Sequence, residues 1–133
     1  MKYQIDNTTK IIDVQKRFNE VYPFLKVEFY KRPYSEKKVS ALKDRIAPGK
    51  IISAEAKSFK PGNIDINGHR TVSALEKEFY KKFGIAMQVS RKSGKIWIET
   101  SKTDDRTLTA QNQLGETMSL PQNVILPEEA NRD

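Results

Sequence analysis

Residues 11–32 have the sequence IIDVQKRFNEVYPFLKVEFYKR, and the spacing of their apolar side chains decides the fold. Apolar residues first recur three and four positions apart: Ile11, Val14, Phe18 and Tyr22. This spacing predicts an amphipathic helix, because 3.6 residues per turn bring those positions onto one face. Between Leu25 and Phe29 every second residue is apolar, which predicts a half-buried strand.

The same two patterns return in residues 72–92, VSALEKEFYKKFGIAMQVSRK. Val72 stands sixty-one positions after Ile11, and one residue is missing between helix and strand in this second copy. Its apolar positions are Val72, Leu75, Phe79, Phe83, Ile85, Met87 and Val89. A helix followed by a strand, present twice, predicts one sheet with two helices on one of its faces.

A short strand is predicted before each helix, at Tyr3-x-Ile5 and at Ile64-x-Ile66. The first helix should stop before Pro23, and the second at Gly84 in a left-handed conformation. The resulting order is strand, helix, strand, strand, helix, strand, with right-handed crossovers. That order predicts a single α+β domain with a ferredoxin-like βαββαβ sheet.

Each predicted helix has candidate capping residues at its start. The side chain of Asn7, Thr8 or Thr9 can accept a hydrogen bond from a free amide of the first helix. The second helix has two alternatives, which are a cap at Thr71 or a capping box over residues 73–76.

An extra strand is predicted after the second copy. Residues 91–98 resemble a hairpin with a two-residue turn at Ser93-Gly94. This register pairs Val89 with Ile98 on the core face and turns Trp97 to the opposite face. Further on, residues 108–114 are predicted to form a short helix that ends at Gly115.

Residues 31–60 break the repeated pattern and are predicted to be a basic insertion. Ser35 can cap a short helix with Val39, Leu42 and Ile46 on one side, and residues 51–59 are predicted to form an additional strand. We therefore predict one domain over residues 1–115, followed by an extended or flexible tail over residues 116–133.

Composition limits the class of protein. The chain has 133 residues and no cysteine, so disulfides, thiol nucleophiles and thiolate metal sites are excluded. No apolar run has the length of a signal peptide core or a membrane span, and we expect a cytoplasmic protein. The net charge is +7, with +6 in residues 31–60 and −3 in residues 101–133. A polyanion partner or a contact between the acidic tail and the basic segment would explain this distribution.

The outer face of the predicted sheet carries aromatic rings between cations. This combination is typical of surfaces that stack nucleic-acid bases and bind phosphates. The candidate binding residues, from this face and its flanks, are Tyr30, Lys31, Arg32, Lys92, Lys95 and Trp97. The alternative interpretation is that residues 101–126 or a second subunit cover the two aromatic rings.

The sequence offers few candidates for catalysis. His69 is the only histidine and lies in a predicted turn, and Asp104-Asp105 resembles a helix start more than a pair of catalytic acids. We therefore predict no catalytic residue, no metal site and no cofactor, and a non-enzymatic protein.

Residues 8–32 and 70–115 resemble a family of small uncharacterised bacterial proteins. The segments that carry the resemblance are RKSG-x-x-W-x-ET-x-x-TDD-x-TL-x-x-QN, residues 91–112, and FLKVEF, residues 24–29. The resemblance implies no activity. The expected function is that of a binding or adaptor domain that acts through protein–protein contacts, including self-association. The alternative is single-stranded nucleic-acid binding through the basic and aromatic sheet face.

Overall fold

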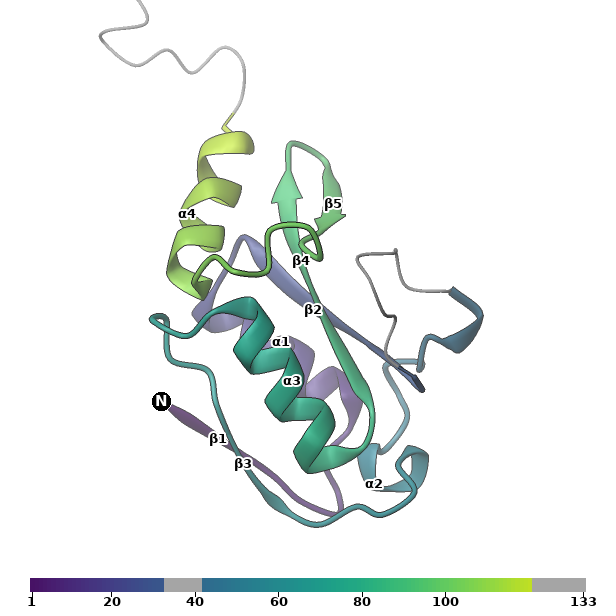
Figure 1. The fold of residues 1–133 in the computed structure, drawn as a ribbon. Helices are drawn as coiled ribbons and strands as arrows, with labels where there is room; N and C mark the ends of the chain where they lie inside the picture. Colours follow the sequence, from purple (N-terminus) through teal and green to yellow (C-terminus); the bar gives the residue numbers. More distant parts are fainter. Residues whose placement is uncertain (33–41, 121–133) are drawn as a thin grey trace, which may run out of the picture.

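The computed structural model describes residues 1–32 and 42–120, which form an α+β fold (Figure 1). The elements in chain order are β1 (Lys2–Ile5), α1 (Ile11–Val21), β2 (Leu25–Tyr30), the 3₁₀ turn η1 (Leu42–Asp44), α2 (Ile52–Glu55), β3 (Gly62–Asp65), α3 (Val72–Phe83), β4 (Ala86–Ser93), β5 (Ile96–Glu99) and α4 (Leu108–Met118). Both copies of the repeated pattern therefore form the predicted helix and strand. Among the described residues, no helix is long and apolar enough to span a membrane.

The strands pair as two antiparallel sheets, which corrects the prediction of one sheet. β1 pairs with β3, and β2, β4 and β5 form a second sheet in that order. A ferredoxin-like domain has all four strands of the βαββαβ order in one sheet, so its pairing is not the one present here. The local pattern predicted each strand correctly, but the same alternation is compatible with either set of partners.

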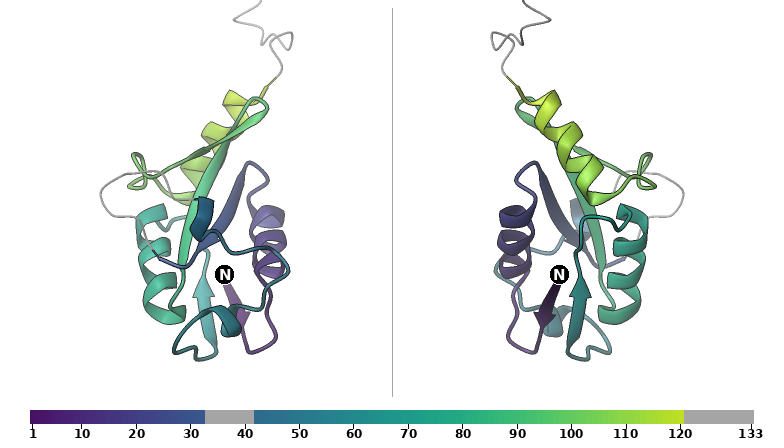
Figure 2. Two further views of the ribbon diagram at one scale, coloured as in Figure 1. Left: turned by 90° about the vertical axis from the view of Figure 1, so that its right-hand side faces the viewer. Right: turned by 90° about the vertical axis from the view of Figure 1, so that its left-hand side faces the viewer.

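The two sheets and the two long helices surround one core. Figure 2 shows α1 and α3 on opposite sides, with the strands between them, instead of side by side on one sheet face. The repeated apolar residues of both helices and both strands are buried, and rings from different elements touch, as Phe29 and Phe79 do with centroids 5.1 Å apart. Each element thus buries one apolar face against the others.

The pairing matches equivalent residues of the two copies. Tyr3 pairs with Ile64, which is its counterpart sixty-one positions later. Glu28 pairs with Gln88, which is its counterpart after the one-residue deletion. Two antiparallel segments that pair through equivalent residues are related locally by a two-fold axis. The two copies therefore pack against each other as two halves of one structure.

Part of residues 31–60, which we predicted to be an insertion, also belongs to the repeat. Residues 44–46 follow the same two-fold relation between the copies, so the prediction of an insertion is corrected there. The amide of Ile46 donates to the carbonyl of Phe29, as the amide of Thr100 donates to that of Val89, the counterpart of Phe29. Tyr30 and Arg45 form a bridge like the pair of Ser90 and Glu99. Residues 44–46 thus correspond to the end of β5. The sequence does not show this because the two segments share no apolar pattern.

The helix after residues 44–46, which is α2, is also equivalent to the helix after β5, which is α4. Residues 51–59 form the short helix α2 and its surroundings instead of the predicted strand, and α2 corresponds to α4. The amide of Ile52 donates to the carbonyl of Thr9, and the amide of Leu108 donates to that of Arg70. The predicted helix around Ser35 and Val39 lies outside the described residues, apart from its end at Leu42 and Ile46.

The start of α1 differs from the prediction. None of Asn7, Thr8 and Thr9 caps it, since the N-cap is Lys10, without a side-chain cap hydrogen bond. The amides of Ile11 and Ile12 donate to the carbonyls of Lys50 and Pro48, each at 2.9 Å. Backbone carbonyls from a distant segment therefore satisfy the free amides, which local sequence cannot predict.

Helix α3 follows the prediction more closely. Thr71 is its cap, and its hydroxyl accepts a hydrogen bond from the amide of Ala74. Gly84 ends the helix with a φ of 78°, in the left-handed region where glycine has no steric cost.

The β4–β5 hairpin turns one residue later than predicted. Ser93 pairs with Ile96, so the turn consists of Gly94 and Lys95, and Gly94 has a φ of 65°. Glycine at the first position of a two-residue turn suits this positive φ, which serine would resist. The register shifts by two residues as a result, and each side chain stays on its predicted face because the period of a strand is two.

Helix α4 runs through Gly115 to Met118, past the predicted end of the domain at residue 115. Gly115 allows the helix to approach β2 and β4 closely. A methyl group at this position would lie 2.9 Å from Cβ of Phe24 and 3.0 Å from Cγ of Arg91. The glycine is therefore a packing residue and not a helix terminator.

We expect Gly115→Ala to destabilise the domain by about 1–2 kcal/mol, since overpacking outweighs the gain of about 1 kcal/mol in helix propensity. Urea unfolding measures this change. Gly49→Ala is the matched control, because a methyl group there meets nothing within 4 Å. Equal stability of the two variants would contradict close packing at position 115.

Candidate binding surface on the edge strand

Strand β5 is the outermost strand of its sheet and exposes three consecutive apolar side chains. The exposed fractions are 62% for Ile96, 36% for Trp97 and 38% for Ile98. We call these three residues the edge triad. In the part of the chain that the structure describes, no strand pairs with the outer edge of β5. Exposed apolar side chains on such an edge are unusual in a monomer, because the edge can pair with another chain.

The backbone of Trp97 points away from the sheet. Arg91 pairs with Ile98, and the amide of Thr100 donates to the carbonyl of Val89. In an antiparallel ladder alternate residues bond to a given neighbour, so Ile98 and Thr100 bond to β4. The backbone amide and carbonyl of Trp97 consequently lie on the open edge.

The end of α4 lies beside the hairpin turn, as Figure 1 shows. The amide of Gly94 donates to the carbonyl of Met118 at 3.1 Å. The side chain of Met118 is 51% exposed, and its residue lies beside the turn that precedes Ile96. Apolar surface is therefore concentrated at the hairpin end of the molecule.

A pocket of about 510 Å³ lies next to the edge triad. It is lined by Arg91, Trp97, Ile98, Glu99, Ser101, Lys102 and Thr103, and we call it the edge pocket. Arg91 is held in place there by Gln111 of α4, whose Oε1 accepts from Nη1 at 3.0 Å. The Nε–H group of Arg91 is buried, and no acceptor among residues 1–32 and 42–120 bonds to it.

Trp97 also contributes to the outer face of the sheet, which is the face that carries Lys26, Glu28 and Lys92. The ammonium groups of Lys26 and Lys92 lie 5.0 and 6.0 Å from the centroid of its ring. Lys26 is paired with Glu28 at 3.4 Å. The lysines and the indole ring attract each other through cation–π interactions. Because Lys26 belongs to β2 and Trp97 to β5, the indole ring lies over β4, the strand between them.

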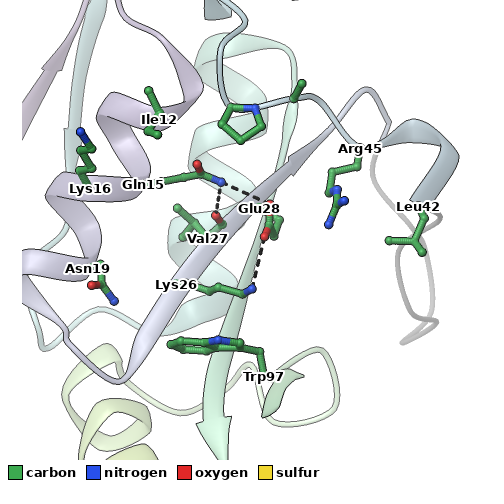
Figure 3. Close-up of a pocket in the computed structure, with 12 residues that line it drawn as sticks. Ile12, Gln15, Lys16, Asn19, Lys26, Val27, Glu28, Leu42, Arg45 and Trp97 are labelled. Carbon is green, nitrogen blue, oxygen red and sulfur yellow. Dashed lines mark hydrogen bonds and ion pairs between the residues drawn. The ribbon is translucent and has the colours of Figure 1, made fainter. Parts of the chain in front are cut away.

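A groove of about 660 Å³ runs from Trp97 between α1 and the segment before α2 (Figure 3). Gln15 and Asn19 form one wall and donate hydrogen bonds to the carbonyls of Val27 and Leu25, on the edge of β2. Side-chain amides therefore cover the part of this edge that residues 44–46 leave open. Lys16 and Arg45 line the same groove and make it cationic.

The six predicted binding residues do not form one surface. Lys92 and Trp97 lie together on the outer face, as predicted. Tyr30 is buried, with 3% exposure, because residues 44–46 run alongside it. Lys95 occupies the hairpin turn instead of the sheet face.

Lys31 and Arg32 are also separated from Trp97. They follow β2 at the end opposite Lys26, about 17 Å further along at the rise of a strand. They line a different pocket, together with Tyr80 and Lys81 of α3. Lys31 and Arg32 therefore belong to a different part of the surface from Trp97.

Sequence analysis missed Ile96 and Ile98 as surface residues. Their alternation predicted burial, but β5 extends beyond the part of the sheet that the helices cover. It also missed Glu76, whose place between Val72 and Phe79 on the apolar face of α3 could have revealed it. Its carboxylate turns inward and accepts a hydrogen bond from the amide of Val89 at 2.8 Å.

Glu76 is the acid most strongly affected by its surroundings among the described residues. Burial raises the pKa of its carboxyl group to about 8, and the negative charges of Asp104 and Glu99 act in the same direction. The hydrogen bond from Val89 opposes this change. At neutral pH the protonated form therefore predominates.

The remaining candidate catalytic residues are not assembled into a site. The ring of His69 contacts the side chain of its neighbour Asn67, with Nδ1 and Oδ1 2.6 Å apart. Asp104 precedes α4, and its carbonyl accepts from the amide of Ser73. No group of three histidine, aspartate or glutamate residues within residues 1–32 and 42–120 is placed to hold a metal ion.

No protein-family model, curated protein or solved structure matches this chain. Its function therefore has to be inferred from its own geometry.

The raised pKa of Glu76 predicts a pH-dependent stability. A carboxyl group that stays protonated in the folded state stabilises the fold fully below its ordinary pKa of 4.5, and this contribution is lost as the pH rises to about 8. Glutamine keeps the acceptor for Val89 but does not ionise. We expect Glu76→Gln to become more stable than the wild type as the pH rises through this range.

Urea unfolding at a series of pH values tests this expectation, with Glu116→Gln as the control at an exposed position. A stability difference between wild type and Glu76→Gln that does not change with pH would disprove it.

Proposed function

We propose that this protein is a non-enzymatic binding domain that acts through protein–protein contacts, and that its contact surface is the open edge of β5. The observation that supports the proposal most strongly is the edge triad. Three adjacent apolar side chains stand there on a strand whose outer backbone groups face away from its sheet.

An extended segment of a partner would add to this edge as a further strand. Backbone hydrogen bonds to the amide and carbonyl of Trp97 would supply affinity, and side-chain pockets would supply specificity. The edge pocket, which Trp97 and Ile98 line beside its polar residues, is suited to receive a side chain of such a strand. A partner strand with alternating apolar residues would cover Ile96 and Ile98 at the same time.

Selection from a phage-displayed library of short random peptides tests this function. We expect the wild-type domain to enrich peptides of alternating apolar pattern, and Ile98→Lys to lose them because a charge would enter the apolar contact. Tyr80→Lys is the matched control, since Tyr80 is 44% exposed on α3 and distant in the chain from β5. Enrichment that is the same for Ile98→Lys and wild type, or no enrichment, would refute the proposal.

A second candidate function is single-stranded nucleic-acid binding on the outer face. The specific observation in its favour is the cluster of Lys26, Lys92 and Trp97, which continues into the groove lined by Lys16 and Arg45. Such a surface would bind phosphates through its cations and a base through the exposed part of the indole ring.

Fluorescence anisotropy with random-sequence single-stranded RNA, at two salt concentrations, tests the second function. We expect binding to weaken as the salt concentration rises. The protein displaces the salt cations that are condensed on the phosphates, and the release of these cations is less favourable at high salt. Trp97→Ala and Lys92→Glu should weaken it further, whereas Lys77→Glu, an exposed position on α3, should have little effect. An absence of binding at low salt, with circular dichroism showing folded protein, would remove nucleic acid from consideration.

A further inference from the structure

The chemistry of β5 identifies a specific partner. We infer that the strand pairs antiparallel with β5 of a second copy of this chain, with the two-fold axis at Trp97. This inference rests on the proposed function, because it assigns the partner of the same edge.

The sequence Lys95-Ile96-Trp97-Ile98-Glu99 is complementary to itself when it is reversed. Antiparallel pairing about Trp97 places Lys95, the turn residue directly before β5, opposite Glu99 of the second copy, and Glu99 opposite its Lys95. Ile96 then faces Ile98 of the second copy on one side of the sheet. Opposite charges and apolar pairs directly across from each other both stabilise antiparallel strands.

The backbone is oriented for this register. The amide and carbonyl of Trp97 lie on the open edge, so the two Trp97 residues would exchange both hydrogen bonds as one pair. Shifting the axis to Ile96 or Ile98 would separate Lys95 from Glu99. The charges therefore select the register about Trp97.

The side chains of β5 meet matching surfaces in this arrangement. Ile98 and Arg91 are cross-strand neighbours and both line the edge pocket. Ile96 of the second copy, which stands opposite Ile98, would enter that pocket from the open edge. The most exposed residue of the edge triad would thereby become buried in both copies.

The same mode of association already exists within the molecule. β2 and β4 pair antiparallel through the equivalent residues Glu28 and Gln88. Pairing of two β5 strands about Trp97 would continue this sheet across a second axis. The dimer would then contain six consecutive antiparallel strands, three from each copy.

Self-association is measured by light scattering and sedimentation over a concentration series. We expect wild type and Tyr80→Lys to form the same dimer, and Ile98→Lys to weaken it by roughly tenfold or more, the effect of losing a central apolar contact. Circular dichroism confirms that each variant is folded.

Charge reversal tests the register without a double variant. Lys95→Glu alone and Glu99→Lys alone each place like charges opposite each other and should weaken their own dimers. A mixture of equal amounts of the two restores opposite charges at both contacts, so we expect heterodimers to exceed the half of all dimers that random pairing gives. Equal amounts of homodimer and heterodimer would overturn the register.

Disulfide formation tests the same geometry, because the natural chain has no cysteine. Ile96→Cys and Ile98→Cys would face each other only across the two copies, at a Cα separation of about 4.5 Å that a disulfide can span. Oxidation of the mixture should yield a linked heterodimer, and oxidation of either variant alone should yield little.

The outcomes separate this inference from the proposed function. A wild type that stays monomeric at every concentration, while peptides still bind through β5, would refute the second copy as partner and leave the function in place. A dimer that Ile98→Lys does not weaken, or links in one cysteine variant alone, would also overturn the inference. Failure of both dimerisation and peptide selection would refute the proposed function with it.

Discussion

The pairing of β2 with β4 is the constraint on which the rest of the structure depends. Each copy of the helix–strand pattern leaves the backbone of its strand unpaired, and the cost of such groups in a buried position forces them to find partners. They find them in each other, with Glu28 opposite Gln88 at the centre. This pairing places α1 and α3 on opposite sides of the core, and it leaves β5 at one end of the sheet. The amides at the start of α1 are satisfied in a similar way, by the carbonyls of a segment that sequence analysis had classed as an insertion.

Much of the local structure could be predicted from sequence, and most of the long-range structure could not. Both long helices and the strands after them follow from apolar spacing, and Gly84 ends α3 as expected. The choice of strand partners does not follow, because a half-buried strand has the same alternation whichever neighbour it pairs with. The relation of residues 44–46 to the end of β5 is carried by backbone hydrogen bonds alone, so no side-chain pattern could show it. Gly115 illustrates the opposite problem, since a residue that commonly ends helices is used here for close packing.

The candidate surface was predicted in part, for similar reasons. Strand alternation placed Trp97 and Lys92 on the outer face correctly, because a shift of two residues in register does not change the face. Alternation also predicted that Ile96 and Ile98 would be buried, because it cannot show where the covering helices stop. Tyr30 was expected at the surface, but the chain that returns after residue 41 covers it. A sheet face is therefore predictable from sequence, whereas its accessibility depends on elements that are remote in the chain.

The exchange of partners between the two copies has a consequence for how the protein folds. β1 can pair only after residues 62–65 have been synthesised, and β2 can pair with β4 only after residues 86–91 have been synthesised. During synthesis the first half of the chain therefore emerges with open strands and an apolar helix face. Closing these long loops has to precede the gain from the contacts, which favours a slow folding step that comes late. A nascent chain of this kind is exposed to aggregation until its second half has been translated.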